Sequence, residues 1–322
     1  MSRGYAVLPA VVLAWLFGSS MLCPPAAGRE VRLALSPQTL PAAPGRHALL
    51  PPETLIDGDA APLYEKALQA LPGKDRDEQM YECLNRPIDQ LPVEQVERTL
   101  ASYTASLKWA FKAARCRSCR WSEGEFEENA VWREGYRRLA LAAELWAKLE
   151  IAREGYEGAV LALQTGFGMA RHLGRAPTLL SRQIGLGVIV IMCRAVEEFV
   201  QAEGSPNLYR ALAQLPKPLV DVEGVPEKEK KAAEETRLLV KRFDSHLTAL
   251  QCVEAIRSYT ASHGGQLPGT LAEITEVAIP NDPIRGEPFH YTRTGSTAVL
   301  ESAVPDGGTE AARVRYVIAV KN

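Results

Sequence analysis

The sequence predicts an α+β protein with more than one domain, in which an array of α-helical hairpins precedes a small domain with one long helix and a three-stranded antiparallel sheet. Two observations support this prediction. Between residues 59 and 224, apolar residues recur at helical spacing and are interrupted by Gly and Pro. Beyond residue 225, one unusually long helical stripe is followed by short alternating segments typical of strands.

The first segment, residues 1–28, is predicted to be a signal peptide. Arg3 precedes a long apolar run, and the small residues at 26–28 suit a signal peptidase that cleaves before Arg29. The alternative is a retained membrane anchor, but Pro9 and the small-residue ending favour cleavage. We therefore expect an exported protein, periplasmic or associated with the cell envelope, with membrane contact only if this segment is retained.

The composition excludes a nucleic-acid-binding protein and a disulfide-stabilised scaffold. With 37 basic and 39 acidic residues, the formal net charge is −2, so no basic field attracts a nucleic acid. The chain has 6 cysteines, sparse and far apart, which do not make a disulfide scaffold. The residues that precede Cys23 lack the pattern of a lipid anchor, and cleavage of the signal would remove this cysteine.

Residues 29–58 are predicted to be a proline-rich linker, since repeated prolines fix φ and remove backbone donors. Residues 59–224 are predicted to be a helical repeat-like domain. Its most apolar part, 183–193, is too short to span a membrane and predicts a helix buried on nearly all sides.

One helical turn suggests a repeat. The segment "EGYEGAVLAL" has Tyr156 and Ala159, and the preceding helix has Ala147 at a position where two helices would cross closely. These residues resemble the turn of a tetratricopeptide unit. No second copy recurs at the right period, so the domain is tetratricopeptide-like rather than a counted array.

Residues 225–322 are predicted to be an α+β domain. One apolar stripe predicts a single long helix that Gly264-Gly265 ends, and three strands follow in "FHYTRT", "TAVLESAV" and "RVRYVIAV". The stripe consists of Leu239, Phe243, Leu247, Leu250, Val253 and Ile256.

The C-terminal quarter contains "AIRSYTASHGGQLPGTLAEI" followed by "PNDPIRGEPFHYTRTGSTAVLESAVPDGG". This order resembles the C-terminal domain of the major pseudopilins of type II secretion systems, which implies a long helix, a hairpin and a docking or capping role. The family's prepilin cleavage site is missing, since Gly18 precedes Ser19, so we do not expect assembly by the family's route. Some pseudopilins bind calcium after this turn, but Asp306 and Glu310 alone offer too few oxygen ligands.

The helical part is similar to a family of exported bacterial helical proteins, through "GDAAPLYEKA", "CRW", "TGFGMARHLGRAPTLLSRQIG" and "SPNLYRALAQLP". This similarity covers most of the mature chain. It implies export and the helical architecture, and it brings no established activity.

No catalytic, cofactor-binding or metal-binding residue is predicted. Cys116 and Cys119 lack the further ligands of a zinc site, although a local disulfide is an option after export. His172 is expected to be a capping or core histidine. Gly166 and Gly168 are expected to allow close helix packing rather than to bind a dinucleotide.

The sequence therefore favours a non-enzymatic scaffold or protein-binding protein of the cell envelope, with an unidentified protein partner on the concave face of the helical array. Two alternatives remain open at this point: an accessory component of a type II secretion-like machine, and an enzyme whose groups converge only in the fold. A pocket that joins His172 or His290 to a carboxylate would favour the enzyme, and an apolar groove along the helices would favour binding.

Overall fold

Helices and one mixed sheet make up the computed structural model, which describes residues 30–321 except 43, 44, 46, 122–129, 226–228 and 307. The predicted α+β class is confirmed. The α-helices are α2 (Ala61–Gln69), α3 (Asp77–Leu84), α4 (Val93–Ala114), α5 (Ala130–Ala152), α6 (Tyr156–Leu173), α7 (Leu179–Phe199), α8 (Tyr209–Ala213) and α9 (Lys230–Ser262). The short 3-10 helices are η1 (Pro52–Thr54), η2 (Lys74–Arg76), η3 (Ile88–Gln90), η5 (Leu271–Glu273) and η6 (Glu310–Ala312).

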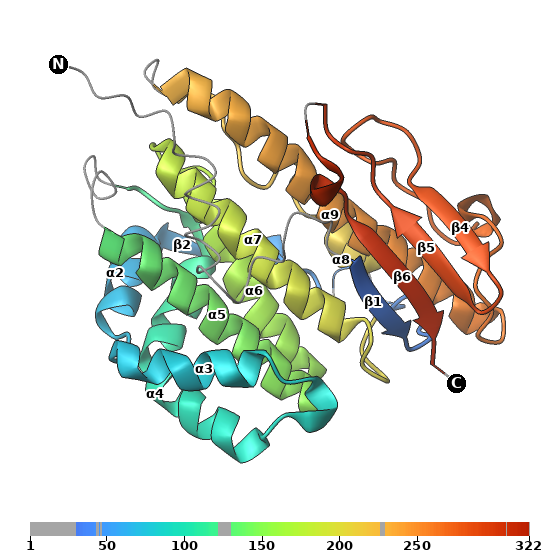
Figure 1. Cartoon of the computed structure of the whole chain (residues 1–322). Coiled ribbons are helices and arrows are strands. Elements are labelled where there is room, and N and C mark those ends of the chain that lie inside the picture. Colours follow the sequence, from blue (N-terminus) through green and yellow to red (C-terminus); the bar gives the residue numbers. More distant parts are fainter. Residues whose placement is uncertain are drawn as a thin grey trace.

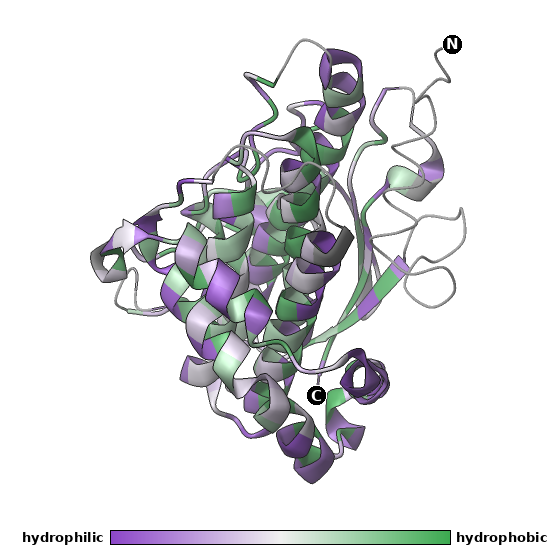
Figure 2. Ribbon diagram, turned by 90° about the vertical axis from the view of Figure 1, so that its left-hand side faces the viewer, coloured by the Kyte–Doolittle hydropathy of each residue, from purple (hydrophilic) through white to green (hydrophobic). Residues whose placement is uncertain are grey.

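Consecutive long helices pack as hairpins (Figure 1). α5 lies against α6 and α7, and α4 lies against α5 and α6, so α4 and α5 each contact both the next helix and the one after it. Colouring by hydropathy shows hydrophobic and hydrophilic residues interleaved along the helices that face the viewer (Figure 2). Such amphipathic helices bury one side and leave the other to solvent.

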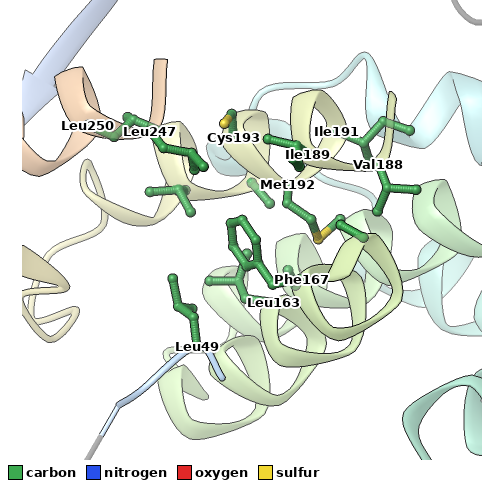
Figure 3. Packing of buried hydrophobic residues seen from close by; sticks show 14 of the residues in the cluster. Leu49, Leu163, Phe167, Val188, Ile189, Ile191, Met192, Cys193, Leu247 and Leu250 are labelled. Atoms are coloured by element: carbon green, nitrogen blue, oxygen red, sulfur yellow. The ribbon is translucent and has the colours of Figure 1, made fainter. Parts of the chain in front are cut away.

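Part of the hydrophobic core lies where α6 packs against α7 (Figure 3). Leu163 and Phe167 of α6 are fully buried and point toward Met192 of α7. A Cβ on Gly166 would lie 1.9 Å from the Met192 sulfur, and a Cβ on Gly168 would lie 2.6 Å from the backbone oxygen of Ala114. Both glycines therefore allow close helix packing, as the sequence predicted.

α7 is the one helix of the described residues that is long and apolar enough to cross a membrane by length and composition. Inside the protein, however, 78% of its most apolar window is buried. The Thr178 hydroxyl caps its start by accepting a hydrogen bond of 3.3 Å from the backbone of Ser181. α7 is thus the buried core helix that the sequence predicted.

Four strands form a mixed sheet in the order β1-β6-β5-β4. They are β1 (Glu30–Leu35), β4 (His290–Thr294), β5 (Thr297–Glu301) and β6 (Arg315–Val320). The three predicted antiparallel strands are β4, β5 and β6, and β1 adds a fourth strand that runs parallel to β6. The prediction of a three-stranded, purely antiparallel sheet was therefore wrong.

The fourth strand comes from residues 29–58, which the sequence predicted to be a linker. The segment "EVRLAL" alternates apolar and polar residues ahead of the first proline of that region, and Leu33 and Leu35 are buried in the sheet. Farther along, β2 (Ile56–Asp59) pairs in parallel with β3 (Cys116–Ser118). Two parts of the expected linker therefore form strands. Residue 59 separates β1 from the helices along the sequence, but not in the folded structure.

The long helix was predicted correctly, and α9 joins the two parts of the protein. It packs against α7 and α8. In Figure 1 it also runs behind the sheet. Tyr316, Ile318 and Leu300 are fully buried on the sheet face turned toward the helices. The predicted signal peptide, residues 1–28, lies outside the described residues.

Candidate functional site

A groove between α2 and α5 is the first candidate site. It encloses about 400 Å³, and half-buried Leu68, Leu71 and Trp132 supply its apolar surface. Charged groups of both signs surround these three side chains. The lining consists of Glu65, Leu68, Gln69, Leu71, Lys74, Trp132, Glu134, Gly135 and Arg138.

Gly135 brings the two helices together at the groove. A Cβ at this position would lie 2.5 Å from Cδ2 of Leu68, so any larger residue would push that leucine aside. α2 itself is short and begins with Pro62 in its first turn, where the missing N–H costs nothing. The width of the groove thus depends on a glycine that the sequence pattern alone does not mark.

One wall of the groove is fixed by a buried ion pair. Arg138 Nε donates to Asp77 Oδ1 over 2.8 Å, and Arg138 Nη2 donates to the carbonyl of Pro72 over 2.6 Å. Tyr103 donates to the same Asp77 oxygen over 2.6 Å, and burial raises the pKa of this tyrosine. These bonds hold the turn between α2 and α3 against α5, so the groove is a rigid feature of the fold.

Aromatic rings continue from the groove into the core. Trp132 contacts Tyr136 with ring centroids 6.2 Å apart, and Tyr136 contacts Tyr64 at 5.8 Å. Trp121 stacks on Tyr64 at 5.9 Å and donates its indole N–H to the carbonyl of His172. The two tryptophans flank residues 122–129, which lie outside the described residues.

His172 is a buried core histidine, as predicted. Tyr64 donates to its Nδ1 over 3.0 Å, and its Nε2 donates to the carbonyl of Cys116 over 3.0 Å. Burial, reinforced by the charge of Arg171, lowers the pKa of His172 to about 3. Both ring nitrogens are engaged, so His172 holds β3 against α6 and offers no lone pair to a substrate.

No disulfide joins Cys116 to Cys119 in the structure. Cys116 begins strand β3, and an extended chain places residues three apart beyond the reach of a disulfide, whose Cα atoms lie within about 7 Å. The optional disulfide between them is therefore not formed. Burial raises the pKa of Cys116, which makes it a poor nucleophile.

A second cavity, of about 390 Å³, opens at one end of the sheet and contains His290 beside carboxylates. Its lining consists of Asp282, Arg285, Glu287, Pro288, His290, Glu301, Ser302, Ala303 and Arg313. A histidine beside carboxylates is the combination that would favour an enzyme. Whether the two buried carboxylates are available for catalysis depends on their hydrogen bonds.

Both buried carboxylates of this cavity are engaged. Asp282 accepts from Ser245 over 2.7 Å and from the backbone of Ala303 over 2.6 Å. Glu301 accepts from Arg313 over 3.4 Å and from Arg315. A general base needs an open lone pair toward its substrate. Because structural donors occupy both carboxylates, the geometry supports a structural role for them.

A third cluster was missed by the sequence reasoning. Glu197 of α7 accepts from His246 of α9 over 3.0 Å and from Tyr316 of β6 over 2.9 Å. Burial opposes a charge on His246, but its interactions with Cys193 and Glu197 prevail and raise the pKa of His246 to about 10. These residues lie far apart in sequence and in no motif, so no local signal could have joined them.

No group of His, Cys, Asp and Glu in the described residues is arranged to hold a metal ion. Asp306 is exposed, and Glu310 pairs with Arg313 at 3.2 Å. Comparisons with protein-family models, with curated proteins and with solved structures find no match to this chain.

Proposed function

We propose that the protein is an exported, non-enzymatic scaffold of the cell envelope that binds an apolar segment of a partner protein in the groove between α2 and α5. The observation that carries this proposal is the groove itself, with three half-buried apolar side chains on its surface and a wall fixed by the Arg138–Asp77 pair.

The groove has the composition of a protein-binding hot spot. Tryptophan is among the residues that dominate the binding energy of protein interfaces, above all where it lines a preformed pocket, as Trp132 does here. A volume of about 400 Å³ accepts one or two large apolar side chains. Glu65 and Lys74 are exposed at the rim and carry opposite charges. This arrangement suits an amphipathic segment whose apolar residue enters the groove while flanking charges meet the rim.

We further propose that the helical part is tetratricopeptide-like. In its favour, Ala147 and Ala159 are fully buried in the paired helices α5 and α6. We also propose that α9 with β4, β5 and β6 forms a pseudopilin-like unit, because a long helix behind an antiparallel hairpin follows the order of that family's elements. An accessory role in a secretion machine would require contacts from this unit rather than from the groove.

Site-specific photo-crosslinking in cells of the source organism tests the proposal. A benzophenone amino acid replaces Lys74 at the rim of the groove, and a matched chain carries it at Leu161, which is 39% exposed on α6. We expect one envelope protein to be crosslinked from position 74 and not from position 161. The variant Leu71→Glu should abolish this product by placing a charge in the groove, whereas Leu161→Glu should preserve it.

The same partner captured equally from both positions would refute the groove as the binding site. Absence of any product from position 74, in a chain whose circular dichroism is unchanged, would refute the protein-binding proposal. A product that forms only when the crosslinker is placed on β4 would transfer the function to the pseudopilin-like unit.

A further inference from the structure

The outer face of the four-stranded sheet carries a regular pattern that the groove proposal does not use. Side chains alternate along each strand, and the inner set contacts the helices, as the bond from Tyr316 to Glu197 shows. The outer set lines up in three rows across the strands in the order β1-β6-β5-β4. The rows are Glu30, Arg315, Glu301, His290; Arg32, Val317, Val299, Thr292; and Ala34, Ala319, Thr297, Thr294.

The first row is an ordered chain of charges. Arg315 stands between two acids, with its Nε 3.2 Å from Glu30 and its Nη1 bonded to Glu301. His290 ends the row on the edge strand. The charges therefore alternate in sign across the sheet from β1 to β4 when His290 is protonated.

This face is accessible in the described part of the chain. The Arg32 side chain is 83% exposed, and Val299 and Val317 are half-buried although both are apolar. Glu301 of the first row is buried, and it pairs with Arg313 and Arg315 of its own chain. In Figure 1 the sheet lies in front of α9, so the described helix that backs it is on the opposite face. Two adjacent valines at the centre of an uncovered strand face suit a second sheet packed against them.

We propose that a second copy of this chain packs on this face, with a two-fold axis parallel to the strands. Such an axis reverses the order of the strands and keeps each row opposite itself. The first row is self-complementary under this operation, because Arg315 then faces the partner's Glu301 and Glu30 faces the partner's His290. In the second row, Val317 faces the partner's Val299.

At the edges of the second row, Arg32 faces the partner's Thr292, a polar residue on the margin of the face. The third row, of Ala and Thr, places Ala319 against the partner's Thr297, and neither side chain is bulky or charged. A copy shifted by one row would instead place Arg315 against the partner's Val299 and Glu301 against the partner's Val317, so the two charges would be desolvated with no ionic contact across the interface. Charge order thus selects a single register, and in an isologous interface each contact occurs twice.

The size of the face predicts a weak dimer. Four strands of this length cover roughly 400 Å² per copy, from standard strand spacing and rise. The total is below the area of a stable dimer, so association should be transient and sensitive to salt.

Sedimentation velocity of the protein expressed from its full sequence tests the dimer. We expect dimer to appear as the concentration rises to about 1 mM and to weaken several-fold at high salt. Val317→Lys should lower the association constant at least about tenfold, because it brings a charge into the centre of the face. Leu238→Lys, at a 42% exposed position on α9, should leave it unchanged. A chain that stays monomeric at the highest concentration would overturn the proposal, as would equal effects of the two lysines.

Disulfide trapping tests the geometry even if Val317→Lys misfolds. Both chains carry Cys119→Ser, which removes the half-buried native thiol, and one has Thr297→Cys while the other has Ala319→Cys. Because Thr297 faces the partner's Ala319, oxidation of the mixture should give at least about fivefold more crosslinked dimer than either chain alone. Equal crosslinking in all three samples, or none in the mixture, would overturn the two-fold arrangement.

Discussion

Tyr316 in the last strand of the sheet donates a hydrogen bond of 2.9 Å to Glu197 in helix α7. The same Glu197 oxygen accepts from His246 in α9 over 3.0 Å. One buried carboxylate therefore joins the sheet, the long helix and the core helix, so the two parts of the protein share a polar contact as well as an apolar one.

Removing the Tyr316 hydroxyl should weaken that junction. We expect Tyr316→Phe to lower the free energy of unfolding by about 1–3 kcal/mol, because Glu197 keeps its burial and loses a donor. Chemical denaturation measures the change. Tyr291→Phe is the control, since its hydroxyl donates to the carbonyl of Pro268 from a half-buried position, and it should cost less. Equal losses of unfolding free energy in the two variants would show that the Tyr316–Glu197 hydrogen bond stabilises the fold no more than the Tyr291–Pro268 bond does.

Arg257 should be one of the most sensitive positions. Its side chain is fully buried, and it donates to the carbonyl of Ser36 after β1 and to that of Ser205 after α7, over 2.6 and 2.7 Å. Arg257→Lys should cost about 3–5 kcal/mol, because the fork of donors is lost while the acceptors stay buried. The exposed pair of Arg237 and Glu223 supplies the control, and Arg237→Lys should cost under about 0.5 kcal/mol. Thermal unfolding of both variants decides between these outcomes.

The two glycines of α6 should differ in their response to alanine. Gly168→Ala would press on the backbone of Ala114, whereas Gly166→Ala would press on the flexible side chain of Met192, which can rotate away. We expect a loss of about 2–3 kcal/mol at Gly168 and a smaller one at Gly166. Denaturation midpoints test the order, and a larger loss at Gly166 would show that the Met192 side chain is rigid.

Asp244 should make the protein less stable as pH rises. Burial raises the pKa of Asp244 to about 7, although Lys217 and the backbone N–H of Leu219 oppose this. The unfolded chain loses this proton near pH 4, so folding loses stability as the pH rises from about 4 to about 7. Asp244→Asn removes this dependence and should be about 1–3 kcal/mol more stable than the natural chain at pH 8. Denaturation of both chains at pH 5 and pH 8 measures it, and parallel changes would contradict the prediction.

His172 should act in the opposite sense. Its pKa of about 3 means that the folded protein keeps the ring neutral while the unfolded chain takes up a proton near pH 6.5. The stabilisation that the neutral His172 ring contributes is therefore fully present above pH 6.5 and is lost as the pH falls toward 3. His172→Gln should flatten the acid side of the stability profile. If the stability of His172→Gln still falls with the original slope between pH 6 and pH 4, then groups other than His172 cause the acid sensitivity.

Elements with local signals could be predicted from the sequence. The long stripe from Leu239 to Ile256 predicted α9, and alternation with turn residues predicted β4, β5 and β6. The strand β1 was not predicted, because its partner β6 lies about 285 residues away in sequence, as the Glu30–Arg315 pair shows, and because prolines follow it closely. The alternation in "EVRLAL" is a local sign of a strand, but nothing local identifies a parallel partner so far away in sequence.

The candidate site was harder to predict than the fold. Trp132 belongs to no motif in the sequence, and its contact with Leu68 and Leu71 depends on how α2 lies on α5. That approach depends on Gly135, which looks like any other glycine within a helical pattern. Similarly, the Glu197, His246 and Tyr316 contacts link three elements, and no spacing in one chain reveals them.

The parallel pairing of β1 with β6 also affects when the sheet can form during synthesis of the chain. β1 emerges first from the ribosome among the described strands, and β6 emerges last, so this pairing cannot form until β4 and β5 have been made. Until then, the exposed edge of β1 has no native partner, and closure of so long a loop is slow. The export that we propose requires an unfolded chain, and late pairing of β1 with β6 keeps the chain unfolded for longer.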